Sequence, residues 1–295
     1  MEKQDNSNKD ELLNSFNTEV VLEIINDYLP KSQKISKEKG IMLVHEAKKL
    51  FFNLKNTKLL EKDIILAKDF FCEGKKDLIR SKRSYSEQDF SDSIYHLQQA
   101  TEKIMKSYGL AQGIFSKKDL RDINHQTPKA FIKMVQEEKI QIYLQSLKRM
   151  HPNLNIDMSG LKKVVETKDK ELALLTIEQI NVLLNLSKKI EKALDKTNLD
   201  KTLKNILPDL AKAQGKKVTY PSFSIIKSST IFIKMYLIAA ITYPHEAFTR
   251  YPDRGIKPSQ YIEDLGIVKA APQIFEILDE TLDFLEKFID WKNKF

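Results

Sequence analysis

Apolar residues return every three or four positions along most of the chain, and this periodicity constrains the fold more than any other feature. Such spacing lines one side of an α-helix, whereas a half-buried strand needs strict alternation of apolar and polar residues. No segment shows that alternation between turn residues. The 295 residues include only 8 glycines and 9 prolines, so few positions interrupt a helix. We therefore predict an all-α fold.

The same periodicity places the individual helices. The main helices are expected at residues 9–29, 41–54, 60–83, 90–108, 129–150, 171–194, 223–248 and 272–291. Gly74 is a weak point within one of them, because glycine is a poor helix former. Gly109 and Gly113 are expected to end the helix that begins at residue 90. Residues 1–60, which precede the strongest pattern, are predicted to form a small N-terminal helical appendage.

The charge of the chain favours an anionic partner. Its 49 lysines and arginines exceed its 41 aspartates and glutamates, which gives a formal net charge of +8. However, the basic residues alternate with acidic ones, as in Lys75-Lys76-Asp77. Such runs are typical of solvated helix faces, so the charge alone does not identify a nucleic-acid surface.

Cys72 is the single cysteine of the chain. It rules out a disulfide within the chain and a zinc site built on several cysteines, and it suits a reducing cytosol. Because it follows Phe70-Phe71 in an amphipathic stretch, we expect a buried, unreactive thiol.

Neither a secretion signal nor a membrane segment is expected. The first ten residues are polar, and the longest apolar run, residues 231–243, is shorter than a membrane crossing and contains Lys234. The sequence therefore predicts a cytoplasmic protein without contact to a membrane.

One helix face carries a row of polar side chains. Four of them follow at intervals of three, four and three residues, which places them on the same side of the helix at 90–108: His96, Gln99, Lys103 and Lys106. Such a row could donate hydrogen bonds to a phosphate or to the edge of a base. The alternative is the ordinary solvent face of an amphipathic helix.

Three short motifs extend this pattern: Gln98-Gln99-Ala100-Thr101-Glu102-Lys103, Asn124-His125-Gln126-Thr127-Pro128 and Arg250-Tyr251-Pro252-Asp253. Their order resembles that of the HEPN family, helical proteins associated with RNA and nucleotides. The resemblance implies an up-and-down helical bundle over residues 61–295, with an additional helical insertion at about 140–222. It also directs attention to Arg121 and His125 as binding residues, beside the polar row of residues 96–106.

Many HEPN proteins are metal-independent ribonucleases whose motif is an arginine followed, after four to six residues, by a histidine, paired across a homodimer. This chain departs from that spacing. Three residues separate Arg121 from His125, and His245 precedes Arg250. A histidine and an arginine supply the proton transfer and the cation that phosphodiester cleavage needs, so His245 with Arg250 is the candidate catalytic pair. The competing interpretation is a helix cap and a surface residue.

Metal and cofactor chemistry have little support in the sequence. His245-Glu246 begins like the helix of zinc proteases, but Thr249 stands where the second histidine would be. The chain has no glycine-rich phosphate loop and no acidic nucleotidyltransferase signature. We expect no metal site and no cofactor, and any nucleotidyl transfer would come from a partner protein.

Together these observations predict a HEPN-like binding module associated with RNA or nucleotides, without enzymatic activity of its own. The resemblance implies a homodimer, a separate nucleotidyltransferase protein as partner, and a defence or toxin–antitoxin setting. Two alternatives stay open. One is a metal-independent endoribonuclease that uses a displaced pair, either His245 with Arg250 or Arg121 with His125. The other is a helical scaffold that binds another protein.

Overall fold

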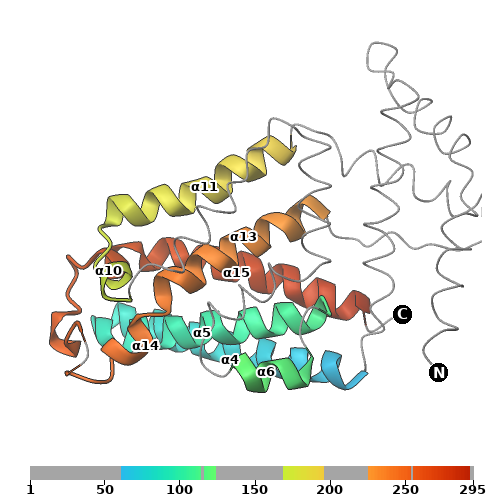
Figure 1. Cartoon of the computed structure of the whole chain (residues 1–295), viewed down its shortest axis with the longest axis horizontal. Helices are drawn as coiled ribbons and strands as arrows, with labels where there is room; N and C mark the ends of the chain where they lie inside the picture. The colour runs from blue at the N-terminus through green and yellow to red at the C-terminus, as the bar shows by residue number, and fades with distance from the viewer. Residues whose placement is uncertain (1–60, 114–115, 124–168, 196–224, 254, 293–295) are drawn as a thin grey trace, which may run out of the picture.

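The computed structural model describes residues 61–113, 116–123, 169–195, 225–253 and 255–292. Of these residues, 82% are helical and none lies in a strand, which confirms the predicted all-α fold. The helices form an up-and-down bundle with additional helices, as expected from the resemblance (Figure 1). The expected helices at 9–29, 41–54 and 129–150 lie outside the described residues.

Two long antiparallel helices, α4 (Glu61–Ser86) and α5 (Phe90–Ala111), form the base of the bundle. Asp89 caps α5, because its carboxylate accepts a hydrogen bond of 3.2 Å from the backbone N–H of Asp92. Gln88 in the turn between the helices has a φ of 62°. Of the two glycines expected to end α5, Gly109 lies within the helix, which continues to Ala111, whereas Gly113 follows its cap with a φ of 70°. Leu110 and Ala111 are buried, and their packing favours the longer helix.

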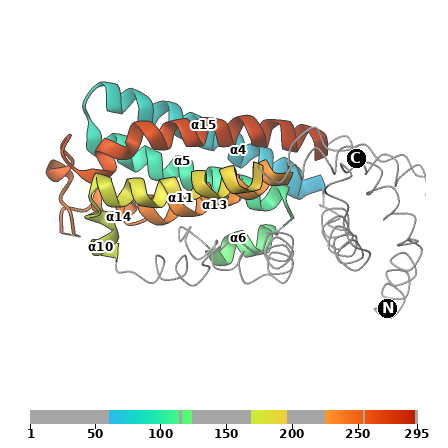
Figure 2. The same cartoon turned by 90° about the horizontal axis from the view of Figure 1, so that it is seen from above.

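Helix α13 (Ile225–Thr242) is the centre of the bundle. Every side chain from Thr230 to Thr242 is buried, as expected of a helix that is apolar on all sides. It packs between α5 and α11 (Ile177–Asp195), and α15 (Gly266–Lys292) contacts all three (Figure 1). Figure 2 shows α15 running alongside α4, with α11 over α13.

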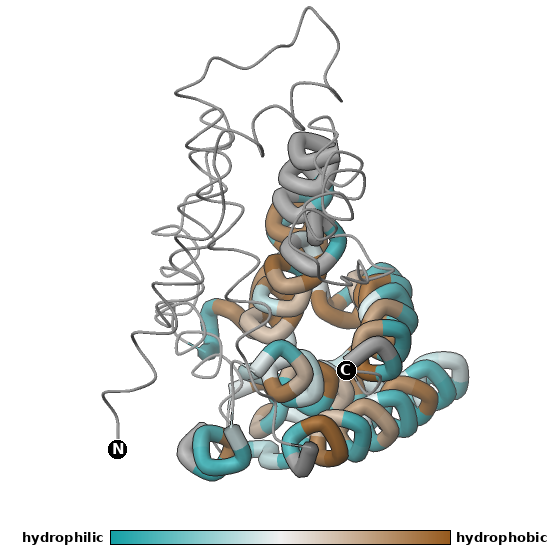
Figure 3. Tube along the Cα trace, turned by 90° about the vertical axis from the view of Figure 1, so that its right-hand side faces the viewer, coloured by the Kyte–Doolittle hydropathy of each residue, from teal (hydrophilic) through white to brown (hydrophobic). Residues whose placement is uncertain are grey.

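The outer helices are amphipathic, and Figure 3 shows hydrophilic and hydrophobic residues alternating along them. Their apolar sides join one core, which includes Leu78 of α4, Leu97 of α5, Ile180 of α11 and Leu278 of α15. Among the residues that the structure describes, no helix combines the length and apolar character that a membrane crossing requires.

Two predicted helices are each divided in the structure. The helix expected at 223–248 ends at Thr242, and a separate turn of helix, α14 (His245–Phe248), begins after Pro244. Pro244 lacks the N–H that a continuous helix would need. The helix expected at 171–194 is split into α10 (Asp169–Ala173) and α11. In that case Thr176 and Gln179 form a reciprocal cap that starts α11.

The last helix is longer than predicted. It was expected to begin at Pro272, but α15 begins at Gly266 and carries Pro272 within it. Buried Ile267, Val268 and Ala270 precede the proline, and their packing against the core outweighs the lost backbone hydrogen bond. Gly266 is required there, because a Cβ would lie 2.1 Å from the carbonyl oxygen of Leu175.

The described part of the expected insertion at 140–222 consists of α10 and α11. Both pack on α13, and α11 also contacts α15. Ile180 and Leu184 of α11 are buried in the common core. The boundaries of the domains, including the appendage at 1–60, stay predictions.

The thiol of Cys72 is exposed, which contradicts the expectation of a buried cysteine. Its neighbour Phe71 belongs to the buried side of α4, with Ala67 and Leu78. One residue further along a helix is a rotation of about 100°, and this turns Cys72 away from the core.

Candidate functional site

A buried carboxylate joins the two long helices. Asp77 of α4 is only 4% exposed, although the run Lys75-Lys76-Asp77 was predicted to be a solvated face. Its carboxylate accepts hydrogen bonds from Lys103 Nζ and, at 3.2 Å, from His96 Nδ1, both on α5. His96 and Lys103 are two helical turns apart, so both reach the same side of α4. A buried carboxylate needs such partners, and Asp77 therefore fixes both side chains.

His96 lies between two carboxylates. Its Nδ1 faces Asp77, and its Nε2 is 3.7 Å from Asp92 Oδ1. Asp92 also accepts a hydrogen bond of 2.6 Å from the hydroxyl of Ser84. The imidazole is 18% exposed, so the ring lies at the edge of the surface and is not fully buried.

Beside His96 is a surface cluster of aromatic rings and one cation. The guanidinium carbon of Arg250 lies 5.3 Å from the ring centre of Tyr95 and 5.6 Å from that of Tyr251. Tyr95 in turn meets His96 edge to face, with ring centres 5.2 Å apart. Arg250 is exposed, and Tyr251 is 46% exposed. We call these four residues, Tyr95, His96, Arg250 and Tyr251, the platform.

The platform joins α5 to the turn that follows α14, which is far away in the sequence. The hydroxyl of Ser91 donates a hydrogen bond of 3.3 Å to the carbonyl oxygen of Thr249, immediately before Arg250. Gly255 has a φ of +77° and packs on Phe248, where a Cβ would come within 2.6 Å of the ring. These contacts hold the turn against α5 and so place Arg250 over Tyr95.

His245 supports this turn from inside the protein. Its side chain is fully buried, and its Nδ1 shares a hydrogen bond of 2.7 Å with the hydroxyl of Tyr261. Burial lowers the pKa of His245 to about 3 and raises the pKa of Tyr261. Nε2 is buried and has no hydrogen-bond partner among the described residues. The imidazole is thus neutral near pH 7.

The geometry gives the members of the predicted catalytic pair different surroundings. His245 is bonded to Tyr261 in the interior, whereas Arg250 lies on the surface over Tyr95. Their joint role in catalysis stays a prediction. The position of His245 favours a structural role, because a general base must reach the proton that it removes.

Among the six predicted binding residues, the structure brings His96 and Lys103 together at Asp77. Gln99 Nε2 donates a hydrogen bond of 2.6 Å to Oε1 of its neighbour Gln98 on α5. Lys106 is buried, pairs with Glu102 and lies over the ring of Phe70. Arg121 is exposed in the short helix α6 (Lys117–Ile123), and His125 lies outside the described residues.

Sequence reasoning did not select Asp77, Tyr95 or Tyr251 as site residues. Tyr95 and Tyr251 are direct neighbours of His96 and Arg250, which were selected, so adjacency was an available signal. Asp77 had no such signal, because its burial depends on how α4 meets α5. In the described part of the chain, no group of three or more histidine, cysteine, aspartate or glutamate residues could hold a metal ion.

Comparison with protein families identifies the segment that carries half of this site. The HEPN domain family model matches residues 67–150. This match confirms, over that segment, the resemblance seen in the sequence. The HEPN match contains α5 and most of α4, and thus Asp77, Tyr95, His96 and Lys103. Arg250 and Tyr251 lie beyond it. Comparisons with curated proteins and with solved structures found no match.

Proposed function

We propose that this protein is a binding module for single-stranded RNA or nucleotides, and that the platform is its contact surface. The observation that carries the proposal is the position of Arg250 between the rings of Tyr95 and Tyr251. Exposed aromatic rings stack on bases of any sequence, and an adjacent arginine adds a cation for the phosphate or for the face of a base.

The cations near the platform support this role. Lys103 is 28% exposed and Arg80 is 55% exposed, and both reach the carboxylate of Asp77. The net charge of +8 attracts a polyanion over a longer range. The HEPN match agrees with a helical module of RNA-associated proteins.

Fluorescence anisotropy with a labelled, unstructured RNA tests the proposal. We expect Tyr251→Ala and Arg250→Ala each to weaken binding about tenfold, because stacking on one aromatic ring is worth roughly 1–3 kcal/mol. The matched control is Arg83→Ala, which removes one charge from a 70% exposed arginine of α4. Affinity should fall as salt concentration rises, because phosphate contacts release counterions. Equal losses in Arg250→Ala and Arg83→Ala would point to nonspecific attraction and reject the platform.

The same incubation, with EDTA present, separates binding from the ribonuclease alternative. Intact RNA in the presence of measurable binding supports the binding module. Cleavage that disappears in the His245→Ala, Arg250→Ala double variant, but persists in Arg83→Ala, would instead assign a metal-independent ribonuclease to this region.

The oligomeric state, the partner and the biological role of the module are part of the same proposal. The HEPN resemblance supports a homodimer, a nucleotidyltransferase protein as partner and a defence or toxin–antitoxin role. Mixing the purified protein with a nucleotidyltransferase encoded beside it, followed by size-exclusion chromatography, tests the partner. Elution of the two proteins in separate peaks would contradict it.

A further inference from the structure

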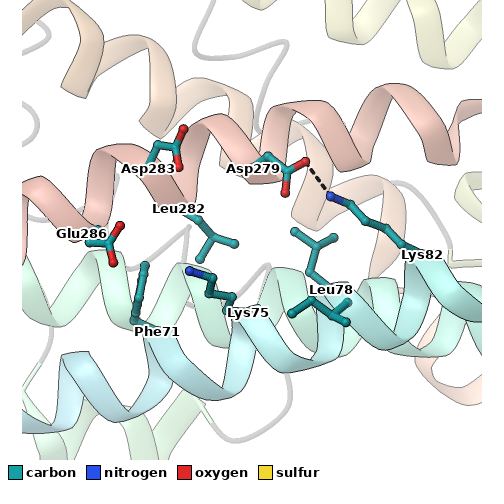
Figure 4. Close-up of a pocket in the computed structure, with 9 residues that line it drawn as sticks. Phe71, Lys75, Leu78, Lys82, Asp279, Leu282, Asp283 and Glu286 are labelled. Carbon is teal, nitrogen blue, oxygen red and sulfur yellow. Dashed lines mark hydrogen bonds and ion pairs between the residues drawn. The ribbon is translucent and has the colours of Figure 1, made fainter.

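A shallow groove runs between α4 and α15 (Figure 4). Phe71 and Leu78 of α4 and Leu282 of α15 line it, and all three side chains are buried, so they form its bottom. Figure 4 shows Lys82 and Asp279 facing each other across the groove, where they form an ion pair of 2.5 Å. The buried apolar side chains and this ion pair hold the two helices together beneath the groove.

On the α4 side, exposed apolar side chains border the groove. Ile79 lines it and is 61% exposed, and Ile65 is 58% exposed. The exposed Cys72 lies midway between them. Intervals of seven residues amount to nearly two helical turns, so these three side chains, which we call the apolar row, follow one side of α4. Apolar residues at this interval are typical of a helix that packs against another helix.

On the α15 side, carboxylates border the groove. Three exposed ones lie seven residues apart and follow one side of α15, and we call them the acidic row: Glu276, Asp283 and Asp290. Among the residues that the structure describes, none of the three takes part in an ion pair. The acidic row is about 21 Å long, because 14 residues of helix rise roughly 1.5 Å each. It presents a line of negative charge along the edge of the groove.

The lysines that line the groove do not pair with the acidic row. Lys82 pairs with Asp279, which lies between the members of the row. Lys75 has its Nζ 5.8 Å from the ring centre of Phe71. The carboxylates of the acidic row are therefore available to cations from outside the described part of the chain.

We propose that this groove binds a basic amphipathic helix of another protein. The apolar side of that helix covers the apolar row of α4, and its lysines or arginines reach the acidic row of α15. A helix laid into a groove is a recurring mode of protein recognition, with anchors at intervals of three, four and seven residues. Charge complementarity selects a basic partner, because like charges across an interface are unfavourable. The same repulsion disfavours RNA on this face, so the inference is independent of the platform.

Fluorescence anisotropy with labelled synthetic peptides tests the proposal on the full-length protein. The probe is an amphipathic helix of lysine and leucine, about 15–20 residues long to match the acidic row. One control peptide has glutamate in place of lysine, and the other has the composition of the probe in a scrambled order without an apolar side. We expect the probe to bind, the scrambled peptide to bind about tenfold more weakly, and the glutamate peptide not to bind. Absence of probe binding, or equal affinity for the probe and the scrambled peptide, would overturn the proposal.

A matched pair of charge reversals tests the surface itself. The double variant Asp283→Lys, Asp290→Lys reverses two charges of the acidic row, so we expect its affinity for the probe to fall about tenfold or more. The control, Glu171→Lys, Glu178→Lys, makes the same change in net charge at exposed residues of α10 and α11. Helix α11 lies across the bundle from α4 (Figure 1), so the control should bind the probe like the wild type. Equal losses in the two variants would show nonspecific attraction and reject the groove.

Circular dichroism verifies that both variants fold. If the reversal at the acidic row prevents folding, Asp283→Asn, Asp290→Asn takes its place, with a loss of affinity of about threefold or more expected. Unchanged affinity in that folded variant would likewise reject the groove.

The single cysteine identifies what lies over the groove. Cys72 is the only thiol of the chain and is exposed within the apolar row, so a benzophenone attached to it reacts on irradiation with whatever covers that row. We expect mass spectrometry to show the probe, and not the glutamate peptide, crosslinked to the protein. Crosslinks to another part of the same chain or to a second copy, without the probe, would overturn the proposal and assign the groove to that occupant.

Discussion

Gly74 of α4 lies directly against Ile104 of α5. A Cβ on residue 74 would be 2.9 Å from Ile104 Cγ1 and 3.3 Å from the backbone nitrogen of Ile104. The sequence suggested a weak point in the helix, whereas the structure shows a close approach that only glycine permits. This contact sets how near α5 comes to α4, and with it the reach of His96 and Lys103 to Asp77.

Gly74→Val should therefore destabilise the protein. We expect a loss of about 1–3 kcal/mol in the free energy of unfolding, because added atoms in a packed contact force neighbouring groups apart. Chemical denaturation measures the loss. Combining Gly74→Val with Ile104→Ala removes the nearest opposing atom, so the double variant should lose less than the sum of the two single losses. Additive losses would show that the two residues do not limit each other.

Asp77→Asn should cost more stability than a comparable change at the surface. The carboxylate of Asp77 is buried and accepts from Lys103 and His96, so its neutralisation leaves their donors poorly paired. We expect a loss of about 1–3 kcal/mol in unfolding free energy. The matched control is Asp279→Asn, which breaks the exposed ion pair with Lys82 and should cost about 1 kcal/mol or less. Equal losses in urea titrations would contradict the buried role of Asp77.

The buried His245 predicts a loss of stability in mild acid. Burial lowers its pKa to about 3, from an ordinary value of about 6.5 in the unfolded chain. Between these values the unfolded state binds a proton that the folded state does not, so stability falls as pH decreases from about 6.5 towards 3. From pH 7 to pH 5 this contribution amounts to about 1–2 kcal/mol. Well above pH 6.5 neither the folded nor the unfolded state binds this proton, so the loss of stability disappears.

Urea unfolding of wild type and His245→Asn at several pH values measures this effect. The variant lacks the titrating group, so it should be less stable at pH 7 but lose less between pH 7 and pH 5. All other groups are common to both proteins, so the comparison of the two slopes isolates the contribution of residue 245. Parallel slopes would show that His245 takes up its proton in the folded protein.

Gly255→Ala should disturb the platform without touching it. Residue 255 has a φ of +77°, and its Cβ would press on the Phe248 ring at 2.6 Å. We expect the turn that carries Arg250 to shift, with a loss of about 1–3 kcal/mol in stability and weaker RNA binding. Phe248→Leu provides space for the added methyl group, so the double variant should regain part of the affinity. Unchanged RNA affinity in a destabilised Gly255→Ala protein would separate the turn from the binding surface.

Local sequence patterns were sufficient for the class of fold and for most helices. The helices predicted at 60–83 and 90–108 correspond to α4 and α5, because their periodicity is strong and Asp89 caps the second. Boundaries were less accurate where a local signal competed with packing. Pro272 suggested a helix start, yet buried residues before it extend α15 to Gly266.

The candidate site was only partly accessible from the sequence. Its motifs led to His96, Lys103 and Arg250, since these types of side chain can bind phosphates or bases. The sequence placed Asp77 on a solvated face and Cys72 in the core, and both assignments were wrong. A shift of one residue along a helix decides between the buried and the exposed side. Residue type does not fix that choice, because charged residues and thiols are found on both sides of helices.

The sequence by itself determined that this chain is helical, that α4 and α5 are amphipathic, and that residues 67–150 resemble a HEPN domain, because periodicity, caps and motifs are local properties. Only the tertiary structure decided that Arg250 reaches Tyr95 and that Asp77 holds His96 and Lys103. It also decided that His245 is buried. These contacts join residues far apart in the chain, and they exist because the apolar faces of separate helices share one core.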